Sequence, residues 1–131
     1  MIRFLGVDLP SLRTGIDIIE IDRISEIVYN YKDRFLKRVF TAQELVEVGS
    51  NPASLSARFA AKEAVAKALG TGIGRVSWQE IEILRGPSRE PQLHLHGTAA
   101  DLAKEQGLVE WAISLSHSRT EAIAVVVATI K

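Results

Sequence analysis

The stretch from residue 55 to residue 74 constrains the fold more than any other part of the chain. Residues 55–69 contain neither Gly nor Pro, are rich in Ala, Leu, Lys and Glu, and stop at Gly70, the residue type that commonly follows a helix C-terminus. Alanines at positions 57, 60, 61, 64, 66 and 68 keep most of this helix slim, so other backbone can approach it closely. We therefore predict a central, buried helix that ends in a glycine loop.

Three functional side chains on this helix share one stripe. Phe59, Glu63 and Lys67 are four residues apart, and residues at this spacing stack along one side of a helix. A plain surface helix would explain Glu63 and Lys67 as an ion pair. A buried helix that carries one carboxylate and several cations instead suggests that these charges serve a site.

The remaining hydrophobic patterns predict an α+β fold in a single domain, residues 1–131, with residues 1–12 as an N-terminal extension broken by Pro10. A helix with Ile21, Ile24 and Val28 on one face follows a short strand, and Thr41 with Glu44 forms a capping box. Residues 122–128 are continuously apolar, like a strand buried on both faces. The predicted strands are 15–18, 78–84, 92–96, 111–116 and 122–128, and the predicted helices are 21–28, 32–40, 42–49, 55–69 and 98–106.

Composition excludes several classes of protein. The chain has no cysteine, which excludes disulfides, thiolate zinc sites and cysteine nucleophiles. Sixteen basic and sixteen acidic residues cancel, so we expect no nucleic-acid partner. No apolar run approaches the roughly 20 residues that span a bilayer, and the N-terminus lacks a signal-peptide pattern. We expect a cytoplasmic protein without a membrane partner.

Two carboxylates are candidates for a metal site. Asp17 stands where the first predicted strand meets its helix, Glu63 lies on the central helix, and Lys67 follows one turn later. Two carboxylates with an incomplete shell suit Mg²⁺, with Mn²⁺ as the alternative, because Mg²⁺ keeps several waters and takes further ligands from substrate phosphates. Spacing along the chain alone leaves open whether these acids meet or have separate structural partners.

Other polar groups permit two interpretations each. The loop Gly70 to Gly74 could approach a phosphate or simply end the helix. The segment Ser114 to Arg119 could bind an anion, or its histidine, His117, could be purely structural. The segment lacks the nucleophile-elbow motif of a serine hydrolase. His94 and His96 share a strand face without a third zinc ligand. The cations of residues 22–38 could be a solvated helix face.

In combination these segments resemble one family. Gly15-Ile16-Asp17-Ile18 with Glu20 to Ile24, then Arg58 to Gly72, then Ser114 to Ser118 resemble, in order and spacing, the 4′-phosphopantetheinyl transferases of the short bacterial type. The resemblance spans about residues 13–129. It implies transfer of the 4′-phosphopantetheine arm of coenzyme A to a serine of apo-acyl carrier protein, as in fatty acid biosynthesis, with release of adenosine 3′,5′-bisphosphate.

The resemblance also implies a role for individual residues. Asp17 and Glu63 would hold the metal, Lys67 would bind a phosphate and assist the leaving group, and Glu63 or a water that it orients would take the serine proton. The positions that match the surroundings of the nucleotide and its 3′-phosphate are Arg58, Lys67, Gly70, Gly72, Ser116 and His117. Those that match the surface for the acidic helix of the carrier protein are Arg23, Arg34, Phe35 and Arg38. The family further implies a homotrimer with active sites between subunits, near residues 122–128.

Two departures from the family pattern affect these assignments. The strand motif normally begins near the N-terminus, whereas here the extension holds a second, similar run, Gly6-Val7-Asp8. We assign the motif to Asp17 because Pro10 prevents a helix directly after Asp8. The turn at residues 86–91 falls where we expect variation to be tolerated. A non-catalytic coenzyme A or nucleotide-binding module and a divalent-metal nuclease stay as alternative functions.

Overall fold

The computed structural model describes residues 2–4, 7–9 and 11–131, with side chains described from residue 11 onward. Its strands are β1 (Ile2–Phe4), β2 (Val7–Leu9), β3 (Leu12–Glu20), β4 (Ile81–Arg85), β5 (Pro91–Leu95), β6 (Leu108–His117) and β7 (Glu121–Ile130). Its helices are α1 (Ile21–Tyr31), α2 (Asp33–Val39), α3 (Ala42–Val48), α4 (Pro52–Ala68), α5 (Gly97–Glu105) and the 3₁₀ turn η1 (Trp78–Glu80). None of the helices in these ranges is long and apolar enough to cross a membrane.

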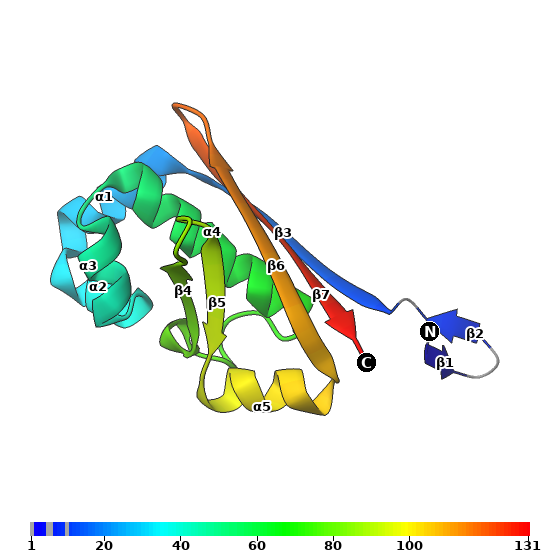
Figure 1. Ribbon diagram of the computed structural model, residues 1–131. Helices are drawn as coiled ribbons and strands as arrows, with labels where there is room; N and C mark the ends of the chain where they lie inside the picture. The colour runs from blue at the N-terminus through cyan, green and yellow to red at the C-terminus, as the bar shows by residue number, and fades with distance from the viewer. Residues whose placement is uncertain (1, 5–6, 10) are drawn as a thin grey trace.

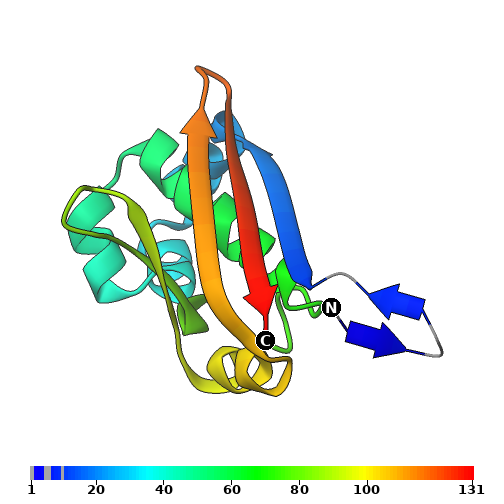
Figure 2. The same ribbon diagram turned by 45° about the vertical axis from the view of Figure 1, so that its right-hand side comes forward.

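A three-stranded antiparallel sheet in the order β3-β7-β6 forms one layer of the domain, and α4 lies against one of its faces (Figure 2). β3 pairs with β7 over nine successive residues, from Leu12 opposite Thr129 to Glu20 opposite Glu121. The predicted strand at 15–18 is therefore much longer, because pairing with β7 extends it in both directions. The α+β fold predicted from the sequence is confirmed, since helices pack against antiparallel sheets in one domain.

The central helix is confirmed as the core of the domain. α4 begins at Asn51, whose side chain accepts a hydrogen bond from the Ser54 N–H (3.0 Å), with Pro52 in the first turn. The helix is therefore longer at its N-terminus than predicted, since Asn51 caps it and Pro52 is its first residue. Its alanine surface packs against β3 and β7, and most of its side chains are buried.

One glycine shows how closely strand and helix approach. A β-carbon on Gly15 of β3 would lie 1.8 Å from the carbonyl oxygen of Ala64 in α4. Such a distance is far below van der Waals contact, so only glycine fits at this crossing. The alanine-lined surface of the helix thus packs against a position of the sheet that has no side chain, Gly15.

The last strand differs from its prediction. In β7 the residues at 122, 124, 126 and 128 are buried, but those between them are only partly buried, and Val125 is exposed. The continuous apolar run therefore has one face on α4 and one face without cover in a single chain. This outer face continues onto β3, where Ile16 and Ile18 are 57% and 58% exposed.

Helices α1 to α3 form a lobe beside α4, and the β4–β5 hairpin with α5 completes the domain (Figure 1). The capping box is confirmed: Thr41 Oγ1 accepts from the Glu44 N–H, and Glu44 Oε1 accepts from the Thr41 N–H. The strand predicted at 78–84 is only half right. Residues 78–80 form the 3₁₀ turn, because Ser77 and Glu80 make a second capping box, and β4 begins at Ile81.

The N-terminal extension forms a small hairpin in which β1 pairs only with β2. It stands beside the end of β3 (Figure 1), and Leu12, the last residue of the predicted extension, is the first residue of β3. Residues 1, 5, 6 and 10 lie outside the described residues, and with them part of the run Gly6-Val7-Asp8 and Pro10.

Candidate active site

Asp17 reaches the site from β3 because side chains alternate along a strand. Gly15 and Ile19, its neighbours on the same face, are buried against the core, so Asp17 also points inward, toward α4. Its carboxylate lies at the edge of this layer and is 18% exposed. Pairing with Ala124 of β7 fixes its place along the sheet.

Lys67 joins the helix to this strand. Its ammonium donates to the backbone carbonyl of Ile16 (2.8 Å) and to Asp17 Oδ1 (3.1 Å). Glu63 lies one helical turn before Lys67, on the same stripe of α4. The side chains of Asp17, Glu63 and Lys67, which spacing alone could not bring together, therefore meet on one side of α4.

A cavity of about 530 Å³ opens at this meeting point. Asp17 and Glu63 both line it, with Phe59 and Arg23 beside them. Phe59 packs against Trp78, with ring centroids 4.6 Å apart and ring planes tilted by 31°. The remaining acids of the lining are Glu20, Asp22, Glu26 and Glu121.

The electrostatics of the cavity suit a cation. Burial raises the pKa of Glu63, and the nearby Asp17 carboxylate raises it further, while Lys67 and Arg23 act in the opposite direction. Acids outnumber cations in this lining, and oxygen donors are what Mg²⁺ prefers. Within the part of the chain that the structure describes, no cluster of three or more His, Asp or Glu side chains could hold a metal alone. Two carboxylates thus fit an ion that takes its other ligands from water and substrate.

The glycine loop after α4 is chiefly a helix stop. Gly70 and Gly72 have positive φ values of 82° and 66°. The Gly70 N–H donates to the Lys67 carbonyl, and the N–H groups of Thr71 and Gly72 both donate to the Ala66 carbonyl. Because these donors already close the end of the helix, the structure gives little support to Gly70 and Gly72 as a phosphate cradle.

Arg58 is held inside the protein. Its side chain is 6% exposed, donates to the Ile83 carbonyl and forms an ion pair with Glu47 (2.8 Å). Burial alone would raise the pKa of Glu47, but the hydrogen bonds from Arg58 and Arg85 outweigh it and lower that pKa. Arg58 therefore has a structural role in this chain. The sequence predicted it only as part of a nucleotide site.

Ser116 and His117 lie at the end of β6, away from Asp17. Ser116 points to the outer face of the sheet and His117 to the inner face. His117 lines a second cavity, of about 340 Å³, which shares no lining residue with the Asp17 cavity. The two cavities lie on different sides of α4, because Ala57 borders one and Glu63 the other. A single chain does not bring His117 to the two carboxylates.

The predicted carrier-protein surface adjoins the Asp17 cavity, because Phe35 stacks on Phe59, with ring centroids 6.1 Å apart. Arg34, Phe35 and Arg38 line a shallow cavity of about 500 Å³ together with Ile27 and Tyr31 of α1. Arg23 of the same helix α1 borders the Asp17 cavity instead. Three of the four residues therefore border an apolar, basic groove, and the fourth borders the cavity of the carboxylates.

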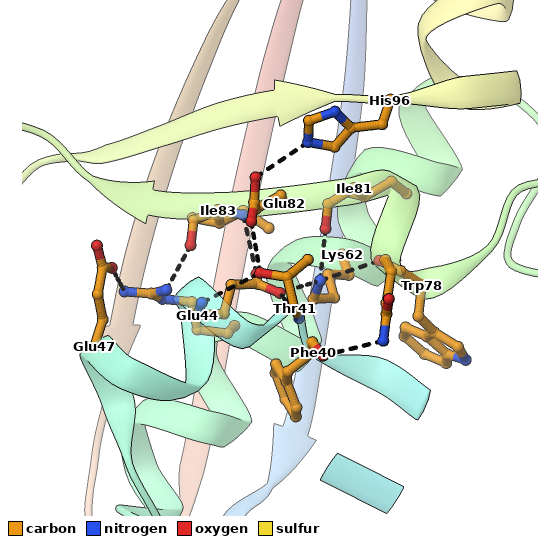
Figure 3. A network of polar contacts seen from close by, with 12 residues as sticks. Phe40, Thr41, Glu44, Glu47, Lys62, Trp78, Ile81, Glu82, Ile83 and His96 are labelled. Atoms are coloured by element: carbon orange, nitrogen blue, oxygen red, sulfur yellow. Dashed lines mark hydrogen bonds and ion pairs between the residues drawn. The ribbon is translucent and has the colours of Figure 1, made fainter. Parts of the chain in front are cut away.

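A buried polar network next to the site was missed by the sequence interpretation (Figure 3). Lys62, fully buried on α4, forms an ion pair with Glu44 (2.7 Å) and donates to the carbonyls of Trp78 and Ile81. Glu44 was predicted only as part of the capping box of Thr41. The one available signal was a lysine within an alanine-rich stretch of helix.

The same network extends to the hairpin. Thr41 Oγ1 donates to Glu82 Oε2 (2.6 Å), and His96 Nε2 lies 3.1 Å from Glu82 Oε1 (Figure 3). His96 thus has a structural partner, in line with the weak case for zinc made from the sequence. The network ties α3, α4 and β4 together directly behind Phe59 and Glu63.

Comparison with known proteins agrees with this geometry. Residues 13–126 match the model of the 4′-phosphopantetheinyl transferase superfamily. A holo-[acyl-carrier-protein] synthase of Herpetosiphon aurantiacus is 48% identical over 88% of this chain and 97% of its own length, and one of Chlamydia trachomatis is 54% identical over 87% and 96%. The crystal structure of the Helicobacter pylori synthase in complex with coenzyme A superposes with a TM-score of 0.82, at 35% identity over 88% of this chain and 99% of that one. The chain therefore belongs to the 4′-phosphopantetheinyl transferase superfamily, among its holo-[acyl-carrier-protein] synthases.

Proposed function

We propose that this enzyme transfers the 4′-phosphopantetheine group of coenzyme A to a serine hydroxyl of apo-acyl carrier protein in the cavity lined by Asp17 and Glu63. The observation that carries the proposal is the meeting of Asp17, Glu63 and Lys67 on one side of α4. In the reaction the serine oxygen forms a bond to the β-phosphorus of coenzyme A, the pyrophosphate bond breaks, and adenosine 3′,5′-bisphosphate leaves.

Asp17 and Glu63 would hold Mg²⁺, or Mn²⁺ in its place. When bound, the ion offsets negative charge on the diphosphate, the usual main contribution to phosphoryl transfer. Lys67 adds a positive charge beside Asp17 and would hold a phosphate oxygen as the leaving group departs. Glu63, or a water that it orients, takes the serine proton.

The carrier protein would dock on the surface formed by Arg23, Arg34, Phe35 and Arg38. Its cations complement an acidic helix, and the groove between Tyr31 and Phe35 offers apolar contact at its centre. Because Arg23 lines the Asp17 cavity, a partner on this surface would present its serine to the two carboxylates.

We further propose that the enzyme acts as a homotrimer with shared sites. Ile16, Ile18 and Val125 form an apolar outer face on the sheet that a single chain leaves exposed. His117 and Ser116 do not line the Asp17 cavity of their own chain, so a neighbouring copy would supply them if they act on the same coenzyme A.

The test is the intact mass of an apo-acyl carrier protein after incubation with coenzyme A, Mg²⁺ and this enzyme. We expect a gain of one phosphopantetheine group with the natural enzyme and with Glu105→Gln, an exposed change on α5 that serves as a matched control. Glu63→Gln and Asp17→Asn should abolish the gain. If no carrier protein gains mass while coenzyme A still binds, the protein is a binding module and the proposed transfer is wrong.

A further inference from the structure

The C-terminal end of α2 turns two backbone carbonyls away from the helical hydrogen-bond pattern. The Lys37 carbonyl would ordinarily accept from the N–H of Thr41, four residues later, but that N–H donates to Glu44 Oε1 in the capping box of α3 (2.8 Å). Phe40, the C-cap of α2, has an extended backbone, so its carbonyl lies beyond the helix. Both carbonyls therefore depend on a donor from another part of the fold.

That donor is Gln79 of η1. Its side-chain amide nitrogen donates to the Lys37 carbonyl and to the Phe40 carbonyl, the latter at 3.2 Å. An amide nitrogen carries two hydrogens, so this one group satisfies both acceptors. Gln79 thus closes the end of α2 from a position 39 residues after Phe40.

The turn η1 is itself attached to the helix that carries Glu63. The Trp78 carbonyl accepts from the buried ammonium of Lys62 (3.0 Å), which directly precedes Glu63 on α4 (Figure 3). The turn is closed by its own capping box, in which Glu80 Oε1 accepts from the Ser77 N–H (2.7 Å). Through η1, the end of α2 is therefore held at a fixed place relative to the Asp17 cavity.

The helix that Gln79 holds carries most of the proposed docking surface. Arg34, Phe35 and Arg38, here called the docking face, all lie on α2, which has seven residues. Two turns of helix are too short to be stable alone, so tertiary contacts must place this helix. Its N-cap side chain makes no capping hydrogen bond. Packing of Phe35 on Phe59 holds its middle, and Gln79 holds its C-terminal end.

We propose that Gln79 is a positioning residue for carrier-protein docking, which keeps the docking face where a bound carrier protein presents its serine to the Asp17 cavity. The inference rests on the proposed function, in which the carrier protein binds this surface. Gln79 lines neither the docking groove nor the Asp17 cavity, so it acts through α2 rather than by touching a substrate. Without its amide, α2 also occupies other positions, and the apparent affinity for the carrier protein falls with the fraction of competent molecules.

The decisive variant is Gln79→Met, which keeps a side chain of similar length and removes the amide donor. We expect the KM for apo-acyl carrier protein to rise by about threefold to tenfold, the range for loss of a hydrogen bond between neutral groups. The KM for coenzyme A and the far-UV circular dichroism spectrum should stay unchanged.

Gln106→Met is the matched control. Gln106 donates to the Leu69 carbonyl at the end of α4 (2.8 Å), so this variant also loses a glutamine hydrogen bond to a helix end. It should lower the thermal midpoint about as much as Gln79→Met and leave the KM for the carrier protein unchanged.

A further combination separates positioning from a general loss of stability. In an enzyme that already carries Arg34→Ala and Arg38→Ala, Gln79→Met should raise the KM for the carrier protein by less than about twofold, because the cations that it places are gone. If the effects multiply instead, if both substrates' KM values rise alike, or if Gln79→Met leaves the KM for the carrier protein unaltered, the assignment of Gln79 is wrong and the function stands. Absence of transfer by the natural enzyme would overturn both.

Discussion

Replacement of Gly15 by alanine should separate β3 from α4 and so disturb the carboxylate pair. The added β-carbon would lie 1.8 Å from the Ala64 carbonyl oxygen and 3.2 Å from the Ala68 nitrogen. Ordinary contact requires a displacement of about 1.6 Å. The clashing atoms belong to backbone, which cannot rotate away as a side chain can. We therefore expect Gly15→Ala to lower the free energy of unfolding by about 3 kcal/mol, the upper part of the range for overpacking.

The same displacement should impair catalysis in molecules that stay folded. Asp17 is two residues from Gly15 on the strand, and Glu63 adjoins Ala64 on the helix, so movement at the crossing separates the two carboxylates. A misplacement of about 1 Å can lower a rate by about a hundredfold. We expect kcat to fall by about this factor, and the Mg²⁺ concentration at half-maximal activity to rise.

The measurement combines urea unfolding, followed by circular dichroism, with the carrier-protein mass assay under conditions where the variant is folded. Thr14→Ala, one residue earlier on the outer face of β3, is the matched control and should change both quantities little. A Gly15→Ala enzyme with unaltered stability and an unaltered Mg²⁺ requirement would refute the claim that this close contact positions the carboxylates.

Three further outcomes follow from the contacts of Lys67, Lys62 and Glu82. Lys67→Met should lower kcat by about a hundredfold or more, as expected when a charged donor to a developing anion is lost, with circular dichroism unchanged. Lys62→Met leaves Glu44 buried without its partner and should lower the free energy of unfolding by about 3–5 kcal/mol in a denaturant titration. Burial alone would raise the pKa of Glu82, but the hydrogen bonds from Thr41 and His96 outweigh it and lower that pKa. These hydrogen bonds therefore stabilise the fold fully above the pKa of Glu82 in the unfolded chain, about 4.3, and the stabilisation is lost as the pH falls through the pKa of Glu82 in the folded protein. The free energy of unfolding, measured between about pH 5 and pH 3, should consequently fall less steeply in Glu82→Gln than in the natural protein.

Local signals in the sequence were sufficient for elements that depend on neighbouring residues. Thr41 with Glu44 predicted the start of α3 correctly, because a capping box involves residues only three positions apart. The end of α4 at the glycine loop was predicted for the same reason. The prediction for residues 78–80 was wrong. Ser77 and Glu80 also form a capping box, but the apolar and aromatic residues that follow favoured a strand.

Features that depend on distant contacts were not predictable in this way. The alternation of burial in β7 depends on which face α4 covers, which a continuous apolar run does not reveal. The partner of Glu44 is Lys62, eighteen residues away, and no local pattern joins them. The placement of Asp17 and His117 in two cavities that share no lining residue also depends on how β3, β7 and β6 pair, which the order of the motifs does not reveal.

The nine-residue pairing of β3 with β7 makes the register of this strand a condition for the proposed catalysis. A slip by one residue would turn Asp17 to the outer face and direct Ile16 or Ile18 toward α4, and it would bring a side chain to the crossing that only Gly15 fits. Insertions or deletions between Leu12 and Glu20 should therefore be absent among active descendants of this chain. Additional sequence placed ahead of Leu12, such as the β1–β2 hairpin, leaves that register intact, which explains how the enzyme can carry an N-terminal addition without moving Asp17.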